Sequence, residues 1–126
     1  MRIVADVMTK HVVDIEADAT VSEAIDKMKQ WNVSSLLVQR KDTTDTWGFM
    51  SQTDIIEKVV AVGLDPEIVR VHEIMTKPVI TVPSNCSLQD CAALMARADI
   101  RRVLVFDGQD IVGIVSSSDI FNVAKV

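Results

Sequence analysis

Aromatic residues are scarce in this sequence, which has no Tyr, two Trp and three Phe among its 126 residues. The apolar content, 48% of the chain, is therefore mainly aliphatic and includes 20 Val and 12 Ile. This content excludes a disordered chain, because burial of so much apolar surface can offset the entropy lost on folding. The length predicts about one domain, able to bury roughly two thirds of its unfolded surface without a disulfide or metal.

Long uncharged apolar runs are also missing, since no stretch approaches the roughly 18 residues that would indicate a membrane span. The N-terminal residues Met1 to Val4 are followed closely by Asp6, which is not typical of a signal peptide. With 18 acidic against 13 basic residues, the net charge of −5 argues against a general nucleic-acid-binding face. We therefore expect a cytoplasmic protein with neither a membrane nor a nucleic acid as its partner.

Cysteine is limited to Cys86 and Cys91, whose spacing matches neither a zinc ribbon nor a redox CxxC motif. His11 and His72 lie far from both in the sequence, so a metal site built from these four residues is the weaker alternative. Free cysteines more often behave as small buried hydrophobic residues. We expect two reduced thiols and no metal.

The chain repeats itself when it is shifted by 67 residues. Val7-Met8-Thr9-Lys10 then matches Ile74-Met75-Thr76-Lys77, and further apolar matches follow. After a polar turn at 41–46, which is two residues longer in the first copy, the offset becomes 65 and residues 48–55 match residues 113–120. Two copies are too few for a solenoid and predict instead a pseudo-twofold pair that shares one core.

Each copy predicts the order strand, helix, strand, strand, helix. The predicted strands are residues 12–15, 33–38 and 49–50 in the first copy, and residues 79–82, 100–106 and 111–115 in the second. Capping boxes at Thr20–Glu23 and Ser87–Asp90 start the first helix of each copy. The second helices begin at Ser51, running to about Val62 with Gly63 as its cap, and at Ser116. Asp65-Pro66 predicts a further helical turn between the copies.

The most specific motif is Gly, two apolar residues, Ser, any residue, Thr or Ser, and Asp, at a strand-to-helix junction. It occurs at Gly48–Asp54 and again at Gly113–Asp119. A helix start attracts phosphate, hydroxyls can bond phosphate oxygens, and a carboxylate can accept bonds from a ribose diol. The alternative is that Ser and Asp three residues apart only cap the helix. Both uses can coexist.

Arg101 and Arg102 form a second feature at the start of an apolar strand. Neighbouring strand residues point to opposite faces, so we expect one of these side chains to point toward the packed face, where a phosphate would satisfy it. A surface position or a salt bridge to Asp99 or Asp107 is the alternative. Ser34-Ser35 occupies these positions in the first copy.

Nothing in the sequence indicates catalysis. No P-loop, GxGxxG or HExxH motif occurs, and no His accompanies a Ser or Cys in a recognisable nucleophile motif. We predict that the chain is not an enzyme. Trp31 is expected to pack at a helix end, whereas Trp47 directly precedes the Gly48 motif and could lie near a ligand.

The tandem repeat, its Val-Met-Thr opening and its Gly-to-Asp-Ile ending resemble a pair of cystathionine β-synthase (CBS) domains, often called a Bateman module, in a stand-alone CBS-domain protein. The resemblance covers about residues 4 to 123. It implies an α/β (α+β) fold in which two βαββα repeats pack by their sheets about a pseudo-twofold axis. The repeats would span residues 4–64 and 74–126, joined by 65–73.

The resemblance also implies a function: a regulatory module, not an enzyme, that needs no cofactor and senses AMP, ADP, ATP or S-adenosylmethionine in clefts between the repeats. Such modules typically form homodimers and signal to a regulated protein. With so few aromatic residues, adenine would be held by aliphatic side chains and backbone rather than by a ring stack. The alternative is a dimerisation or scaffold module with no small ligand, in which the Ser and Asp residues are only caps.

The family pattern assigns two sets of ligand-contacting residues, in which Asp54 and Asp119 would bind ribose and the hydroxyl side chains would bind phosphate. One cleft would comprise Val12, Val13, Val33 and Ser34 with Ile114, Ser116, Ser118 and Asp119. The other would comprise Val79, Ile80, Ile100 and Arg101 with Phe49, Ser51, Thr53 and Asp54. Arg101 and Arg102 match the family's basic phosphate contacts.

Overall fold

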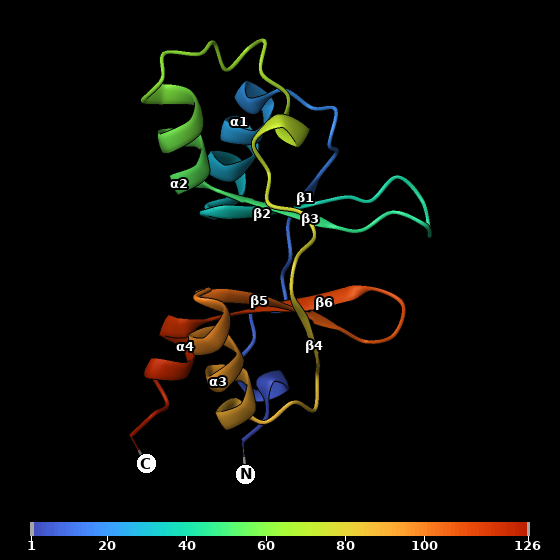
Figure 1. The fold of residues 1–126 in the computed structure, drawn as a ribbon, viewed down its shortest axis with the longest axis vertical. Coiled ribbons are helices and arrows are strands. Elements are labelled where there is room, and N and C mark those ends of the chain that lie inside the picture. Colours follow the sequence, from blue (N-terminus) through green and yellow to red (C-terminus); the bar gives the residue numbers. More distant parts are fainter. Residues whose placement is uncertain (1, 126) are drawn as a thin grey trace. The chain divides into compact units, whose positions relative to one another are not determined.

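A computed structural model describes residues 2–125 of the chain and divides them into two compact units. The middle unit is Val13–Val79, and the terminal unit combines residues 2–12 with residues 80–125, so that it holds both ends of the described chain. The α/β fold class is confirmed, because each unit has a three-stranded sheet with helices packed on it (Figure 1).

The middle unit follows the predicted order of strand, helix, strand, strand and helix. Its elements are β1 Asp14–Ile15, α1 Val21–Trp31, β2 Ser35–Val38, β3 Gly48–Ser51, α2 Gln52–Ile55, the π-helix η2 Ile56–Val60 and the 3-10 helix η3 Val71–Glu73. The sheet order is β1-β2-β3, with β1 parallel and β3 antiparallel to β2. A parallel neighbour needs a crossover connection, which α1 supplies.

Aliphatic side chains from every layer of the middle unit form its core. Val21, Ala24 and Met28 form the buried face of α1, and Leu36, Val38 and Met50 meet it from the sheet. The 3- and 4-residue spacing on α1 places its apolar residues on one face, and the aliphatic residues of β2 are buried at consecutive positions.

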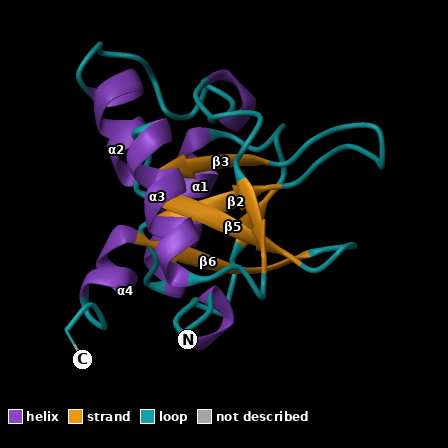
Figure 2. Cartoon of the chain, turned by 60° about the horizontal axis from the view of Figure 1, so that its bottom comes forward, coloured by secondary structure: helices purple, strands orange, loops and turns teal. Residues whose placement is uncertain are grey.

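The terminal unit has the same plan. Its elements are the 3-10 helix η1 Val4–Asp6, β4 Thr81–Pro83, α3 Leu88–Ala98, β5 Arg102–Phe106, β6 Ile111–Ser116 and α4 Ser117–Phe121. The sheet order is β4-β5-β6, with α3 and α4 packed on it (Figure 2). The predicted hairpin turn at Asp107-Gly108 is present, with Gly108 at a φ of +105°.

The opening segment of each repeat packs on the return strand of the other repeat. Thr9 pairs with Ile114 of β6 in the terminal unit, and Thr76 pairs with Phe49 of β3 in the middle unit. The boundaries of the two sequence repeats therefore differ from the boundaries of the two compact units.

Gly48 and Gly113 leave room for the two opening segments, residues 7–10 and 74–77, which are exchanged between the repeats. A Cβ atom on Gly48 would lie 2.6 Å from the Met75 sulfur, and one on Gly113 would lie 2.5 Å from the Met8 sulfur. Both distances are shorter than side chains tolerate, so Gly at the first position of the motif is explained by packing in both units.

Two predicted helical segments differ in detail from the structure. The helix that begins after Ser51 is α-helical only to Ile55 and continues as the π-helix η2, although Gly63 does adopt the predicted positive φ, of +74°. The segment from Asp65 forms a single turn, in which the Asp65 carboxylate accepts a hydrogen bond from the Glu67 amide at 2.9 Å.

The capping boxes predicted for α1 and α3 are only half formed. Thr20 Oγ1 accepts from the Glu23 amide at 3.1 Å, and Ser87 Oγ accepts from the Asp90 amide at 3.0 Å. The reciprocal bonds to the Thr20 and Ser87 amides are absent from the hydrogen bonds of the described residues. Thr20 instead pairs with Arg70 in an isolated bridge, and the Leu88 amide donates to the Arg2 carbonyl.

No helix among residues 2–125 has the length and apolarity needed to cross a membrane.

Candidate functional site

The Ser51–Asp54 motif lies where β3 runs into α2. Ser51 Oγ accepts from the Asp54 amide at 3.3 Å, while Asp54 Oδ2 accepts from the Ser51 amide at 2.9 Å and from its hydroxyl at 3.2 Å. Ser51 has extended backbone angles and α2 begins at the next residue, which is the geometry of an N-cap. The structure thus forms the complete capping box that the spacing predicted.

The second copy repeats this geometry between β6 and α4. Ser116 Oγ accepts from the Asp119 amide at 3.2 Å, and Asp119 Oδ2 accepts from the Ser116 amide at 2.8 Å. Each motif also offers an exposed hydroxyl two residues after its capping serine, Thr53 in the first copy and Ser118 in the second. Capping uses the serine and one carboxylate oxygen, so it leaves these hydroxyls available for another group.

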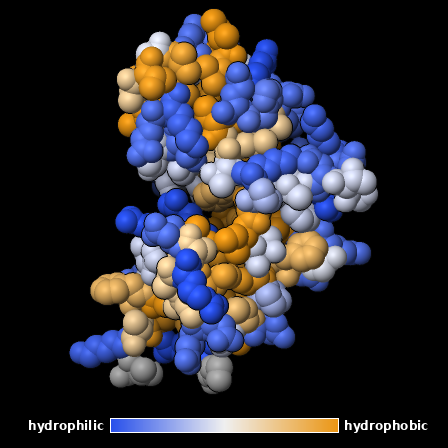
Figure 3. Space-filling view, in the orientation of Figure 1, coloured by the Kyte–Doolittle hydropathy of each residue, from blue (hydrophilic) through white to orange (hydrophobic). Residues whose placement is uncertain are grey.

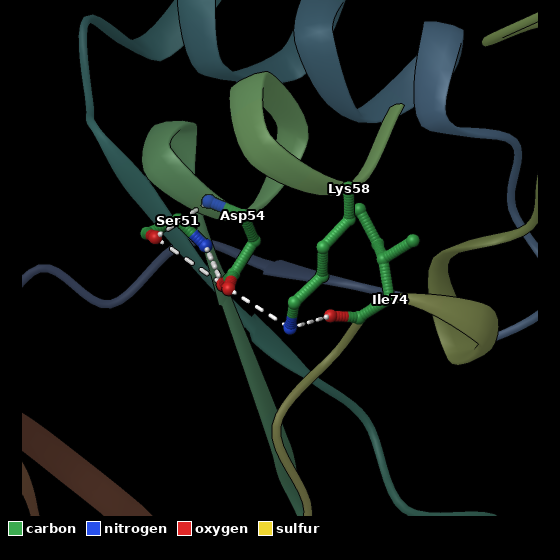
Figure 4. A network of polar contacts seen from close by, with 4 residues as sticks. All are labelled: Ser51, Asp54, Lys58 and Ile74. Carbon is green, nitrogen blue, oxygen red and sulfur yellow. Dashed lines mark hydrogen bonds and ion pairs between the residues drawn. The ribbon is translucent and has the colours of Figure 1, made fainter. Parts of the chain in front are cut away.

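The carboxylate of Asp54 has a further bond that its counterpart lacks. Lys58 Nζ lies 3.1 Å from Asp54 Oδ1 and donates to the Ile74 carbonyl at 3.0 Å (Figure 4). Lys58 was not among the site residues predicted from the sequence. Its position four residues after Asp54 on a helix was the signal that could have found it.

Arg101 and Arg102 lie beside the second motif within the terminal unit. The Ser117 amide donates to the Arg101 carbonyl at 2.8 Å, and Arg102 is opposite Ser116 in the register of β5 and β6. The expectation that one of the two points toward the packed face is wrong, since both are exposed. Arg101 precedes the strand, which begins at Arg102, so strand alternation does not apply to it.

The first copy has serines at these two positions. The Gln52 amide donates to the Ser34 carbonyl at 3.0 Å, and Ser35 is opposite Ser51. The backbone is therefore matched between the copies, whereas the side chains differ by two positive charges.

The remaining predicted site residues fall on both units. In the middle unit, Val13 is buried, Val33, Phe49 and Val79 are half-buried, and Ser34 is exposed. In the terminal unit, Val12, Ile100 and Ile114 are half-buried and Ile80 is exposed. Each set assigned from the family pattern thus draws residues from both units.

Within each unit the structure brings some of these residues together. Thr9, which lies three residues before Val12, exchanges backbone hydrogen bonds with Ile114, and Thr76, which lies three residues before Val79, exchanges them with Phe49. The exchanged opening segments therefore pass beside the strands that carry the motifs.

Cys86 and Cys91 show no chemistry of a metal or redox site. Burial raises the pKa of both thiols above the ordinary value, which disfavours the thiolate that binds metal or attacks as a nucleophile. Within residues 2–125, no group of three or more His, Cys, Asp and Glu side chains is placed to hold a metal ion. Cys91 instead belongs to the core of the terminal unit.

Trp47 has a defined contact within the middle unit. The Arg40 guanidinium lies 4.0 Å from the centre of its ring, which is cation–π geometry. The half-buried Trp47 lies at the end of the turn that precedes Gly48, as its place in the sequence predicted.

Known proteins resemble the whole chain. It is 33% identical over 120 residues to the CBS domain-containing protein YhcV of Bacillus subtilis, covering 95% of this chain and 84% of YhcV. The structure of a hexameric CBS-CP12 protein from bloom-forming cyanobacteria matches with a TM-score of 0.92 at 37% identity, over 99% of this chain and 72% of that one.

A third relative was solved with a metal. The structure of Hypoxic Response Protein I with two coordinated zinc ions matches with a TM-score of 0.77 at 26% identity, covering 97% of this chain and 98% of that one. The corresponding sequence from Mycobacterium tuberculosis is 29% identical over 115 residues, 91% of this chain and 80% of its own length.

The family model for the CBS domain matches residues 4–61 and again residues 71–125. These two matches contain both Ser–Asp motifs, both sheets and the helices packed on them. The chain therefore belongs to the CBS domain family and carries two CBS domains, a pair that is generally a regulatory module.

Proposed function

We propose that this CBS-domain pair senses an adenosine-containing ligand of the AMP, ADP, ATP or S-adenosylmethionine class and signals its presence to a partner protein. The observation that carries the proposal is the doubled motif. In a chain of this family, two strand-to-helix junctions each present a carboxylate, a capping serine and an exposed hydroxyl. Nothing in either motif resembles a catalytic group, so we propose no reaction.

The chemistry of the motifs suits a nucleoside. A carboxylate accepts hydrogen bonds from the two hydroxyls of a ribose, and hydroxyl side chains donate to phosphate oxygens. Half-buried aliphatic residues such as Ile100 and Ile114 provide apolar contacts for adenine in place of aromatic rings. We retain the residues assigned from the family pattern as the predicted contacts.

Signalling would follow from population shift. A ligand that binds one conformation of the chain better than another increases the fraction of that conformation, and a partner that distinguishes the two then responds. Such coupling needs only a difference in ligand affinity between the two conformations.

We also propose that a second copy of the chain is a partner, as the family pattern implies. Apolar side chains are exposed over η2 and the turns that follow it, a region that Figure 3 shows at the upper left. The residues are Ile56, Val60, Val62, Leu64 and Ile68. Association of copies would remove this apolar surface from water.

Calorimetric titration tests the ligand proposal. AMP, ADP, ATP and S-adenosylmethionine are titrated into the unaltered protein and into the double variant Asp54→Ala, Asp119→Ala. We expect at least one ligand to bind the unaltered protein and none to bind the variant, whose free energy of unfolding falls by about 1 kcal/mol for each reciprocal serine-amide to carboxylate bond that is lost. Asp110→Ala is a matched control, because it removes an exposed carboxylate outside both motifs.

The scaffold alternative predicts a different result. The double variant would lose the same stability, because the capping boxes are present either way. Folded, unaltered protein would bind none of the four ligands, and this outcome would reject the proposal.

A further inference from the structure

The chain segments that follow the two motifs differ at the fourth residue after the motif aspartate. In the middle unit, Lys58 Nζ is held by two oxygens, the Asp54 Oδ1 atom at 3.1 Å and the Ile74 carbonyl at 3.0 Å (Figure 4). Asp54 Oδ2 is already used by the amide and hydroxyl of Ser51. Both oxygens of this carboxylate therefore have partners from the chain itself.

In the terminal unit the corresponding residue carries no charge, and the Arg2 guanidinium there donates to its backbone carbonyl at 2.8 Å. The offset of 65 residues that aligns Asp54 with Asp119 also aligns Lys58 with Val123, which cannot form an ion pair. Asp119 Oδ2 accepts from the Ser116 amide, but among the hydrogen bonds and ion pairs of residues 2–125 none reaches its Oδ1 atom. This carboxylate has an oxygen available to a ligand.

A second difference between the two motifs also favours ligand binding at the second one. The backbone bonds beside the motifs are equivalent, from Gln52 to Ser34 in one unit and from Ser117 to Arg101 in the other. Arg102 is opposite the capping serine of the second motif, whereas the neutral Ser35 is opposite the capping serine of the first. This positive charge favours an anionic ligand at the second motif, whose carboxylate is also less occupied.

We infer that Lys58 determines which motif binds: it occupies Asp54, so that the Asp119 motif is the higher-affinity site for the nucleoside. The inference deepens the proposed function and depends on it. A ribose hydroxyl that donates to Asp54 must compete with the Lys58 ammonium group, which the Ile74 carbonyl also holds in place. A ribose hydroxyl that donates to Asp119 has no such competitor among the described ion pairs. Because the Lys58 side chain is 44% exposed, water screens the ion pair and limits the effect.

Reciprocal variants test the role of Lys58. In an Asp119→Ala background, where only the first motif remains, Lys58→Val should raise the affinity for AMP and for adenosine by roughly two- to fivefold, the value of a solvent-exposed ion pair. In the otherwise unaltered chain, Val123→Lys should lower the affinity of the second motif. Lys58→Arg is the matched control, since it keeps the positive charge and should change little.

Adenosine and AMP together separate the two roles that Lys58 could have. If Lys58 excludes ribose, both ligands gain affinity when it is replaced by Val. If it binds phosphate instead, AMP loses affinity and adenosine does not, and the inference is overturned. Circular dichroism of each variant checks that the fold is retained.

The remaining outcomes distinguish the two proposals. Two equal sites per unaltered chain, or loss of binding in Asp54→Ala but not in Asp119→Ala, would overturn the inference and leave the proposed function standing. No binding of any of the four proposed ligands, or of adenosine, by the unaltered chain or by Lys58→Val would overturn both.

Discussion

Among the described residues the shortest ion pair joins Asp45, in the polar turn between β2 and β3, to Lys77, with 2.6 Å between Oδ1 and Nζ. Asp45 Oδ2 also accepts from the Lys41 amide at 3.0 Å. The Lys77 ammonium, followed by the amides of Lys41 and Thr46, lowers the pKa of Asp45 from 3.8 to about 2. This ion pair connects the longer polar turn of the first repeat to the segment 74–77, which lies beside β3.

A lowered pKa in the folded state makes stability depend on pH. The Asp45 contribution is fully present above its unfolded pKa, near 3.8, and is lost as the pH falls through about 2. Asp45→Asn should therefore be less stable than the unaltered protein at pH 6, and the difference should disappear near pH 2. Urea denaturation at a series of pH values measures it.

Lys77→Met is the control for this prediction, because it keeps the carboxyl group but removes its main partner. Its stability difference from the unaltered protein should follow the same pH dependence. A difference that stays constant from pH 6 to pH 2 would contradict the assignment.

Single residues were predicted well where local spacing determines the interaction. Ser and Asp three residues apart predicted the caps at Ser51 and Ser116, and both form. Lys58 was missed because its second bond, to Ile74, joins residues 16 positions apart. The prediction that one of the two arginines is buried was wrong because it extended strand alternation to Arg101, one residue before the strand begins.

The number, type and order of the elements follow from the sequence pattern, since apolar residues recur at helical spacing in α1 and α3 and short apolar runs, rich in β-branched residues in the terminal unit, form the strands. The ends of these helices were less predictable. Asn32 and Asp99 both adopt left-handed backbone angles at the C-caps, with φ of 52° and 53°. Their alignment in the repeat was a usable signal, because Asn and Asp tolerate this conformation better than most residues.

The exchange of opening segments could not be predicted from the repeat. Self-similarity shows that residues 7–10 and residues 74–77 are equivalent, but it does not say on which copy each one packs. Val4 and Val71 illustrate the result, since both are fully buried, Val4 in the core of the terminal unit and Val71 in that of the middle unit.

These two valines, 67 residues apart, give a matched test of the exchange. Val4→Ala should lower the amide-exchange protection of β5 and β6, although Val4 belongs to the first repeat by sequence. Val71→Ala should instead lower the protection of β2 and β3. Each change should reduce the free energy of unfolding of its own unit by about 2 kcal/mol, from lost burial and an unfilled cavity.

Hydrogen–deuterium exchange with mass spectrometry resolves the two units. Protection lost in β2 and β3 on Val4→Ala, with β5 and β6 unchanged, would mean that each repeat packs on itself and would contradict the exchange.

For the molecule as a whole, the positions of the exposed apolar residues say more about possible partners than their number does. The scarcity of aromatic residues favours aliphatic contacts over a ring stack for a nucleoside, while the aliphatic residues fill two cores. The apolar residues outside the cores are unevenly distributed over the surface. In η2, Val59 is buried, whereas Ile56 and Val60 are exposed, Val60 by 59%. A helix with apolar residues on both faces is typical of one that packs on two sides.

If a second copy covers this surface, Val60→Asp should weaken association, because it would place a charge in an apolar interface. The variant should sediment as a monomer at concentrations where the unaltered protein sediments as a dimer or larger assembly. Glu57→Ala, on the same helix but without a new charge, should associate normally. Val60 lies outside the Ser51–Asp54 motif and the exchanged segments, so ligand binding should change little. A monomeric unaltered protein, or a variant that assembles equally well, would show that copies of the chain do not meet through η2.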